Sequence, residues 1–108
     1  MSQPIPYRPL GILKNVLDSL GFQVTHCYED LVFVEHNAFL LRMEEKGEEV
    51  SLFFNTDSEA DKRAGIAEAL YSAGSRYRLA ITTKGTYRLT PNERNKNSLD
   101  LDLRENRL

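Results

Sequence analysis

The sequence predicts an α+β domain in which an antiparallel meander sheet of five to six strands packs with two helices. Apolar residues recur at helical spacing in 10–20 and alternate with polar residues in 23–55, and a second helical segment precedes further alternation in 77–90. Of the 108 residues, 29 are Leu, Ile, Val or Phe, which is sufficient for one folded domain. The expected order is helix, three or four strands, helix, two strands, with an edge strand at the C-terminus.

The first helix is predicted to follow an extended lead-in at residues 1–9, which contain three of the four prolines. From there five apolar residues recur every three or four positions and form one stripe. They are Leu10, Leu13, Val16, Leu17 and Leu20. Gly21 is the expected end of this helix, because glycine readily adopts the left-handed conformation that follows a helix cap.

Residues 23–55 are predicted to form the strands of a meander, with turns at 29–30, 36–37 and 46–47. The last turn brings apolar residues of two strands to one face of the sheet. The expected pairs are Met43 with Val50, Leu41 with Leu52 and Phe39 with Phe54. Carrying the alternation back through the other turns adds Val32, Val34 and Cys27 to the same face, which is the expected core side.

A second helix is predicted to start at a capping box formed by Thr56 and Glu59 and to end at Gly74. The residues after it indicate two strands joined by a hairpin loop at 83–85, with Ile81 opposite Tyr87. This division gives a lead-in at 1–9, a single α+β domain at 10–91 and a polar tail at 92–108. Within the tail, residues 99–103 alternate Leu with Asp, as an edge strand would.

Cysteine and histidine are too few for most metal or redox sites. Cys27 is the single cysteine, so the chain can form neither an internal disulfide nor a four-cysteine zinc site. His26 and His36 are ten residues apart, and neighbours in a strand such as His26 and Cys27 point to opposite faces. The carboxylates cluster at predicted turns. We therefore expect no catalytic residues, no metal and no cofactor.

Charge and hydropathy indicate the expected compartment. The longest apolar runs are four residues, far below the roughly 20 that span a bilayer. The N-terminal residues lack the apolar stretch of a secretory signal. We expect a cytoplasmic protein that does not bind membranes.

The same registers place a second apolar group on the face opposite the expected core. This group consists of Tyr28, Leu31, Phe33, Leu40 and Phe53. An antiparallel sheet with helices on one side normally exposes its other side to water, so this group needs a cover. The alternatives are a helix of the same chain packed on each face, a second copy of the chain, or a protein partner.

Basic residues are concentrated in the C-terminal half. Residues 62–96 contain eight lysines and arginines and two acidic residues. Arg76, Arg78, Lys84 and Arg88 would contact phosphates if the basic strand face at 76–88 binds nucleic acid. The alternative is a solvated basic face that complements the acidic turn at 44–49 of another molecule.

The predicted order from Leu10 to Thr90 is similar to that of the type III secretion chaperone-like fold. This resemblance implies a small acidic cytosolic protein that dimerises through its sheet and binds extended partner segments. The leading prediction is a protein-interaction module, adaptor or chaperone-like, that self-associates and has no catalytic activity. A nucleic-acid-binding domain is the alternative.

Overall fold

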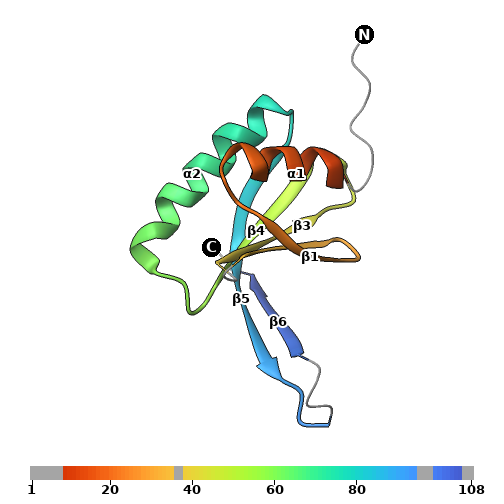
Figure 1. Ribbon diagram of the computed structural model, residues 1–108, viewed down its shortest axis with the longest axis vertical. Coiled ribbons are helices and arrows are strands. Elements are labelled where there is room, and N and C mark those ends of the chain that lie inside the picture. The colour runs from red at the N-terminus through yellow and green to blue at the C-terminus, as the bar shows by residue number, and fades with distance from the viewer. Residues whose placement is uncertain (1–8, 36–37, 95–98, 106–108) are drawn as a thin grey trace.

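The computed structural model describes residues 9–35, 38–94 and 99–105, which form two helices and six strands (Figure 1). In chain order these are α1 (Leu10–Ser19), β1 (Val24–Tyr28), β2 (Leu31–Val34), β3 (Phe39–Met43), β4 (Glu49–Asn55), α2 (Ala60–Arg76), β5 (Ala80–Pro91) and β6 (Leu99–Glu105). The α+β class and the order helix, four strands, helix, two strands are confirmed. The lead-in predicted at 1–9, except Pro9, and the turn at 36–37 lie outside the described residues.

The six strands form one sheet in their chain order, β1 to β6. Neighbouring strands are antiparallel except β4 and β5, which are parallel. The sheet is therefore not wholly antiparallel as predicted. The reason is that α2 returns the chain along the sheet, so β5 starts at the same end as β4. We call the side covered by α1 and α2 the helix face, and the opposite side the outer face.

The predicted strand registers of the first half of the chain are confirmed. Met43 lies opposite Val50, as predicted, and the other two pairs of β3 and β4 follow the same register. Val32 lies opposite Leu41 and Cys27 opposite Val32. Short turns and one apolar face determine these pairings, because a slip of one residue would exchange the two faces of a strand.

α1 ends at Gly21, as predicted. Gly21 has a left-handed backbone with φ 83°, and its N–H donates to the Asp18 carbonyl at 3.1 Å. The Phe22 N–H donates to the Leu17 carbonyl at 2.9 Å. These two bonds make a Schellman motif, which pairs carbonyls that the helix leaves free. The Phe22 ring then packs edge-on against Phe39, with centroids 5.0 Å apart.

α2 does not start with the predicted capping box. Glu59 is the residue before the helix, and no side chain caps the helix N-terminus. The Asn55 side-chain oxygen accepts the Asp57 N–H at 2.8 Å, so the chain is still turning where the box would place helix. The Arg63 guanidinium stabilises this turn instead, donating to the carbonyls of Asn55 at 3.1 Å and Thr56 at 3.4 Å.

α2 also continues past its predicted end at Gly74. The Gly74 carbonyl accepts the Leu79 N–H at 2.8 Å, and Arg78 takes the left-handed position with φ 64°. A Cβ at position 74 would lie 2.7 Å from Cδ1 of Ile81. A larger residue here would force the Ile81 side chain to shift, so the close packing of α2 on β5 favours glycine, whereas the turn that ends the helix uses an arginine.

The hairpin predicted at 83–85 is wrong, because β5 runs straight through these residues as one strand. Leu52 pairs with Thr83 and Phe53 with Gly85, which leaves Lys84 as a bulge. The bulge exchanges the faces, so Ile81 and Tyr87 lie on opposite faces and not together as predicted. Gly85 has no positive φ; its Cβ would lie 1.8 Å from the Arg104 carbonyl oxygen of β6.

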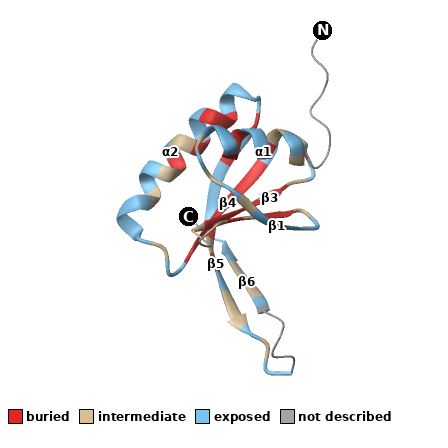
Figure 2. Cartoon of the chain, viewed as in Figure 1, coloured by how far each residue is buried: buried red, intermediate tan, exposed pale blue. Residues whose placement is uncertain are grey.

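Both helices pack on the helix face and enclose the main core. The fully buried residues there include Leu13 and Leu17 of α1, Leu70 of α2 and Leu52 of β4. Within α2, Ala67 and Leu70 are buried, whereas Ala60, Ala64 and Tyr71 are exposed. Figure 2 shows the buried residues gathered where the helices meet the sheet.

The outer face holds a second, smaller core because the sheet is strongly curved. Leu31, Leu40, Phe53 and Tyr87 are buried there together, each on a different strand. The rings of Phe33 on β2 and Tyr87 on β5 lie 6.3 Å apart. A flat sheet would separate strands three places apart by about 14 Å. The outer face is therefore concave, and side chains of strands that are not neighbours meet across it. β5 and β6 project beyond the rest of the sheet (Figure 1).

Candidate functional site

The apolar group predicted to be an exposed interaction face is mostly buried by its own chain. Leu40 and Phe53 are fully buried, Leu31 is nearly so, and Phe33 is half-buried. The cover is neither a second helix nor another molecule: the curved sheet itself brings Tyr87 of β5 and the leucines of β6 over these residues. Tyr28 is the one member that remains well exposed, at 59%.

β1 offers an accessible backbone edge. It is an outer strand of the sheet and pairs with β2 along one side. Val24 is half-buried and the other four residues are exposed. None of the five is Asp, Glu, Lys, Arg or Pro. β1 therefore lacks two of the usual protections against pairing with another strand, charged residues and proline, although a bulge at Thr25 interrupts its register with β2.

β6, the other outer strand, is different. It carries Asp100, Asp102, Arg104 and Glu105, so charged side chains cover much of its length. The Arg104 guanidinium contacts the Asp102 carboxylate at 3.2 Å, and Glu105 contacts Arg42 at 2.8 Å. Charged residues on an edge strand oppose the approach of another chain. The two edges of the sheet are therefore not equivalent.

Cys27 does not belong to the core, contrary to the prediction. It has the predicted partner, Val32, but Val32 is fully buried while Cys27 is exposed. The register correctly assigned its face, yet β1 lies at the margin of the sheet, where burial falls (Figure 2). Cys27 is exposed because β1 is an outer strand of the sheet, and periodicity within a strand does not show whether that strand is central or outer.

The four predicted phosphate contacts do not form one basic strand face. Arg76 is in α2 and lines a groove between the helices, and Arg78 is in the turn after α2. Lys84 lines a cavity with Arg42, whereas Arg88 lines a different one with Asp102. The predicted face is wrong because residues 77–79 are not strand and the Lys84 bulge interrupts the alternation of β5.

A charged cluster on the outer face joins β3 to β6. The Arg42 guanidinium contacts Glu44 through Nε at 2.8 Å and Glu105 through Nη2 at 2.8 Å. The Ser51 hydroxyl donates to Glu44 at 2.5 Å, and Arg42 also lies 4.9 Å from the centre of the Phe53 ring. The ion pair of Arg42 with Glu105 links β3 to β6, which are far apart in the chain.

The protonation states in this cluster favour its ion pairs. Burial lowers the pKa of Arg42, but the hydrogen bonds to Glu105 and Glu44 outweigh it and leave that pKa raised. Burial raises the pKa of Glu44, but the hydrogen bonds from Ser51 and Arg42 outweigh it and hold that pKa below its ordinary 4.5. Both partners are therefore charged at neutral pH, and this pair is not poised for proton transfer there.

No group of three or more His, Cys, Asp or Glu side chains within the described ranges could hold a metal ion. His26 and Cys27 are adjacent on the exposed strand β1, while His36 lies outside the described residues. The expectation that the protein has no metal, cofactor or catalytic residues stays a prediction.

Comparison of the chain with protein-family models, curated proteins and solved structures found no match. The likeness to the chaperone-like fold thus still depends on element order alone. Neither described helix is long and apolar enough to cross a membrane.

The accessible edge of β1 and the groove at Arg76 could not be predicted from the sequence pattern alone. The alternation of Val24–Tyr28 indicated a strand, but an edge can be assigned only when the order of strands is known. The absence of charged residues from Val24–Tyr28, against four in Leu99–Glu105, was the signal available. The sequence has no comparable signal for the groove, because the groove forms between the end of α1 and α2, which are far apart in the chain.

Proposed function

We propose that this chain is a non-catalytic protein-interaction module that binds an extended segment of a partner protein as an added strand along β1. The observation that carries the proposal is the exposed, uncharged edge of Val24–Tyr28. Such an edge offers backbone N–H and C=O groups for β-augmentation. Backbone hydrogen bonds would supply affinity, and contacts with alternate side chains would supply selectivity.

Side chains beside this edge favour apolar or aromatic residues in the added segment. His26 and Tyr28 lie opposite Phe33 and Leu31 on the outer face. The rings of His26 and Phe33 are 6.0 Å apart, and Tyr28 is 59% exposed. A strand beside β1 would direct every second side chain over these residues. Burial of the Tyr28 ring would add to the affinity.

The charge near β1 favours a basic segment. Residues 22–35 contain Glu29, Asp30 and Glu35 and no lysine or arginine. Attraction to these carboxylates would increase the rate of association with a segment that has lysine or arginine near its ends. An acidic segment would be repelled.

The element order supports the same class of function. It resembles that of type III secretion chaperones, whose members bind extended partner segments. Because a shared fold does not establish function, the proposal depends mainly on the properties of β1.

A displayed library of random peptides would test the proposal. Peptides selected on the full chain should be extended and enriched in basic residues, and they should slow amide hydrogen exchange in Val24–Tyr28. The double variant Thr25→Lys, Cys27→Lys places positive charge on two exposed residues of the edge and should weaken binding at least about tenfold. The control Thr82→Lys adds charge to an exposed residue of β5, a strand that does not neighbour β1 in the sheet.

Three outcomes would contradict the proposal. The first is a selection that yields no peptide that binds in solution, and the second is a bound peptide that protects amides of another element. The third is a dimer, detected by sedimentation at increasing concentration, that the double variant converts to monomer. That result would assign β1 to a second copy of the chain and not to a partner segment.

A further inference from the structure

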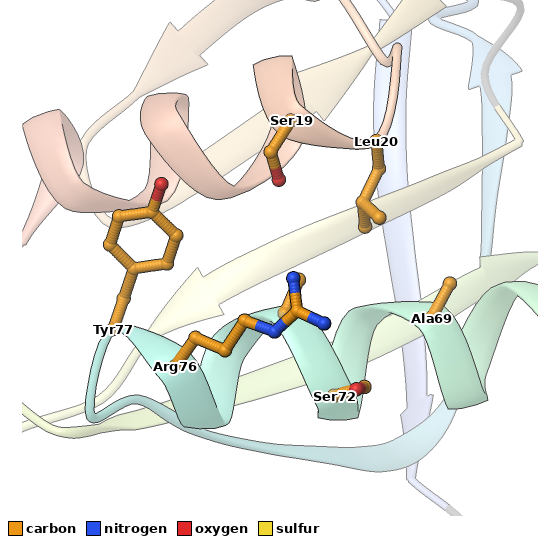
Figure 3. Close-up of a pocket in the computed structure, with 7 residues that line it drawn as sticks. Ser19, Leu20, Ala69, Ser72, Arg76 and Tyr77 are labelled. Carbon is orange, nitrogen blue, oxygen red and sulfur yellow. The ribbon is translucent and has the colours of Figure 1, made fainter.

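A groove of about 310 Å³ separates the C-terminal end of α1 from the last turns of α2 (Figure 3). Its lining consists of Ser19, Leu20, Ala69, Ser72, Ala73, Arg76 and Tyr77. Ala69, Ser72 and Arg76 share one side of α2, because residues three and four apart lie on the same face. The small alanine side chains leave the space open, and its volume is at the low end of the roughly 300–1,000 Å³ typical of small-molecule sites.

The polar groups of this groove are mainly hydrogen-bond donors. The guanidinium of Arg76 projects between the helices, and the hydroxyl of Tyr77 points toward α1 (Figure 3). The side chains of Arg76, Ser72 and Tyr77 make no hydrogen bond or ion pair with the described residues. Among the described residues, no carboxylate lines the groove. Arg76 therefore differs from Arg42, whose charge is neutralised by two glutamates.

The helix ends beside the groove do not need Arg76 as a cap. The Val16 carbonyl accepts the Ser19 hydroxyl at 2.7 Å, and the Leu17 carbonyl accepts two backbone N–H groups. At the end of α2, the Gly74 carbonyl likewise accepts two N–H groups. The C-terminal dipoles of both helices favour the positive charge of Arg76 and oppose an anion, so binding of an anion here depends on this guanidinium. The guanidinium keeps its own hydrogen-bonding capacity for another molecule.

We propose that this groove binds the phosphate group of a small phosphorylated molecule. A guanidinium binds two oxygens of a phosphate at once. A phosphate monoester carries a charge of about −1.5 to −2 at pH 7, more than a carboxylate, so the guanidinium attracts it more strongly. Leu20, Ala69 and Ala73 provide apolar contact for the rest of the molecule. The site contains no residue of β1 and is independent of the function proposed above.

Inorganic phosphate is the first probe, followed by NMR of the ¹⁵N-labelled full chain. Amide shifts should concentrate at 19–20 and 69–77, and acetate should produce smaller ones. Arg76→Gln should reduce phosphate affinity about tenfold or more, because it removes a charge-assisted pair. Arg78→Gln is the matched control: it removes the same charge two residues away, from a side chain that does not line the groove. It should leave most of the affinity.

The outcome that would overturn the proposal is equal weakening by the two variants, which indicates general electrostatic attraction. Shifts centred outside the groove, or no saturable shift with phosphate, would overturn it as well. Binding by Arg76→Lys distinguishes the two kinds of contact: a bidentate site loses affinity with lysine, whereas a site that needs only charge does not. Retention of full affinity by Arg76→Lys would contradict the bidentate geometry.

Discussion

Arg78 has a backbone conformation that is unfavourable for an L-amino acid. Its φ of 64° lies in the left-handed region, which costs a residue with a Cβ about 1–2 kcal/mol. The Arg78 N–H donates to the Ser75 carbonyl at 3.1 Å, as position C′ of a Schellman motif requires. The same position after α1 is occupied by Gly21, which adopts this conformation without that cost.

We expect Arg78→Gly to increase the free energy of unfolding by about 1 kcal/mol, since glycine relieves the backbone strain. Urea denaturation at neutral pH followed by circular dichroism would measure it. Arg76→Gly, in the last turn of α2, is the control and should destabilise, because there glycine replaces a helical residue. A loss of stability in Arg78→Gly would mean that the arginine side chain makes contacts worth more than the strain.

At the scale of elements, β5 shows how a glycine can be misassigned. Thr83-Lys84-Gly85 has the composition of a hairpin loop, and local sequence favours a turn. The structure instead uses Gly85 where the backbone of β6 crosses closely, with the Arg104 carbonyl oxygen where a Cβ would be. Pairing with both β4 and β6 outweighs the local preference.

We expect Gly85→Ala to destabilise the protein by about 1–3 kcal/mol, because the added methyl group forces β6 away from β5. Urea denaturation would report the loss, and faster hydrogen exchange in Leu99–Glu105 would locate it. Gly65→Ala is the matched control: nothing lies within 4 Å of its added Cβ, and alanine favours helix, so stability should rise slightly. A neutral Gly85→Ala would contradict the close approach of the two strands.

At the scale of the whole molecule, the curved sheet is held across its outer face by two contacts that span several strands. One is the ring contact of Phe33 with Tyr87, and the other is the ion pair of Arg42 with Glu105, 63 residues apart in the chain. Both contacts connect the meander β1–β4 to the pair β5–β6. Each of these two contacts can be removed by a single substitution, so the contribution of each to closure of the outer face can be measured separately.

The charged cluster also makes stability depend on pH. Glu44 has a folded-state pKa below its ordinary value of 4.5, so its carboxylate stabilises the fold at higher pH. This contribution is lost as pH falls below about 4.5 and through the lower folded-state pKa. We expect the free energy of unfolding to fall in that range, and Glu44→Gln to fall less steeply.

Urea denaturation between neutral pH and pH 3 would measure this dependence. Glu45→Gln is the control, because Glu45 is exposed and makes no ion pair with the described residues. Identical pH profiles for Glu44→Gln and the unchanged chain would show that Arg42 and Ser51 do not stabilise the carboxylate.

Features that depend on residues close together in the chain could be predicted from the sequence. The stripe of α1 and its end at Gly21 follow from spacing within a few turns. The registers of β1–β4 follow from short turns and from burial of one face, since a slip of one residue exchanges the faces. The strand at Leu99–Glu105 was likewise evident from its alternation.

The contacts between residues far apart in the chain depend on the three-dimensional arrangement of the strands and helices. The bulge at Lys84 depends on pairing with β4, and it reverses the face on which Tyr87 lies. The curvature of the sheet buried Phe53 in a second core, although its periodicity suited an exposed interface equally well. The accessible edge of β1 and the groove at Arg76 have the same origin. Each arises where segments far apart in the chain come together. The periodicity and composition of a segment do not show which other segments it contacts.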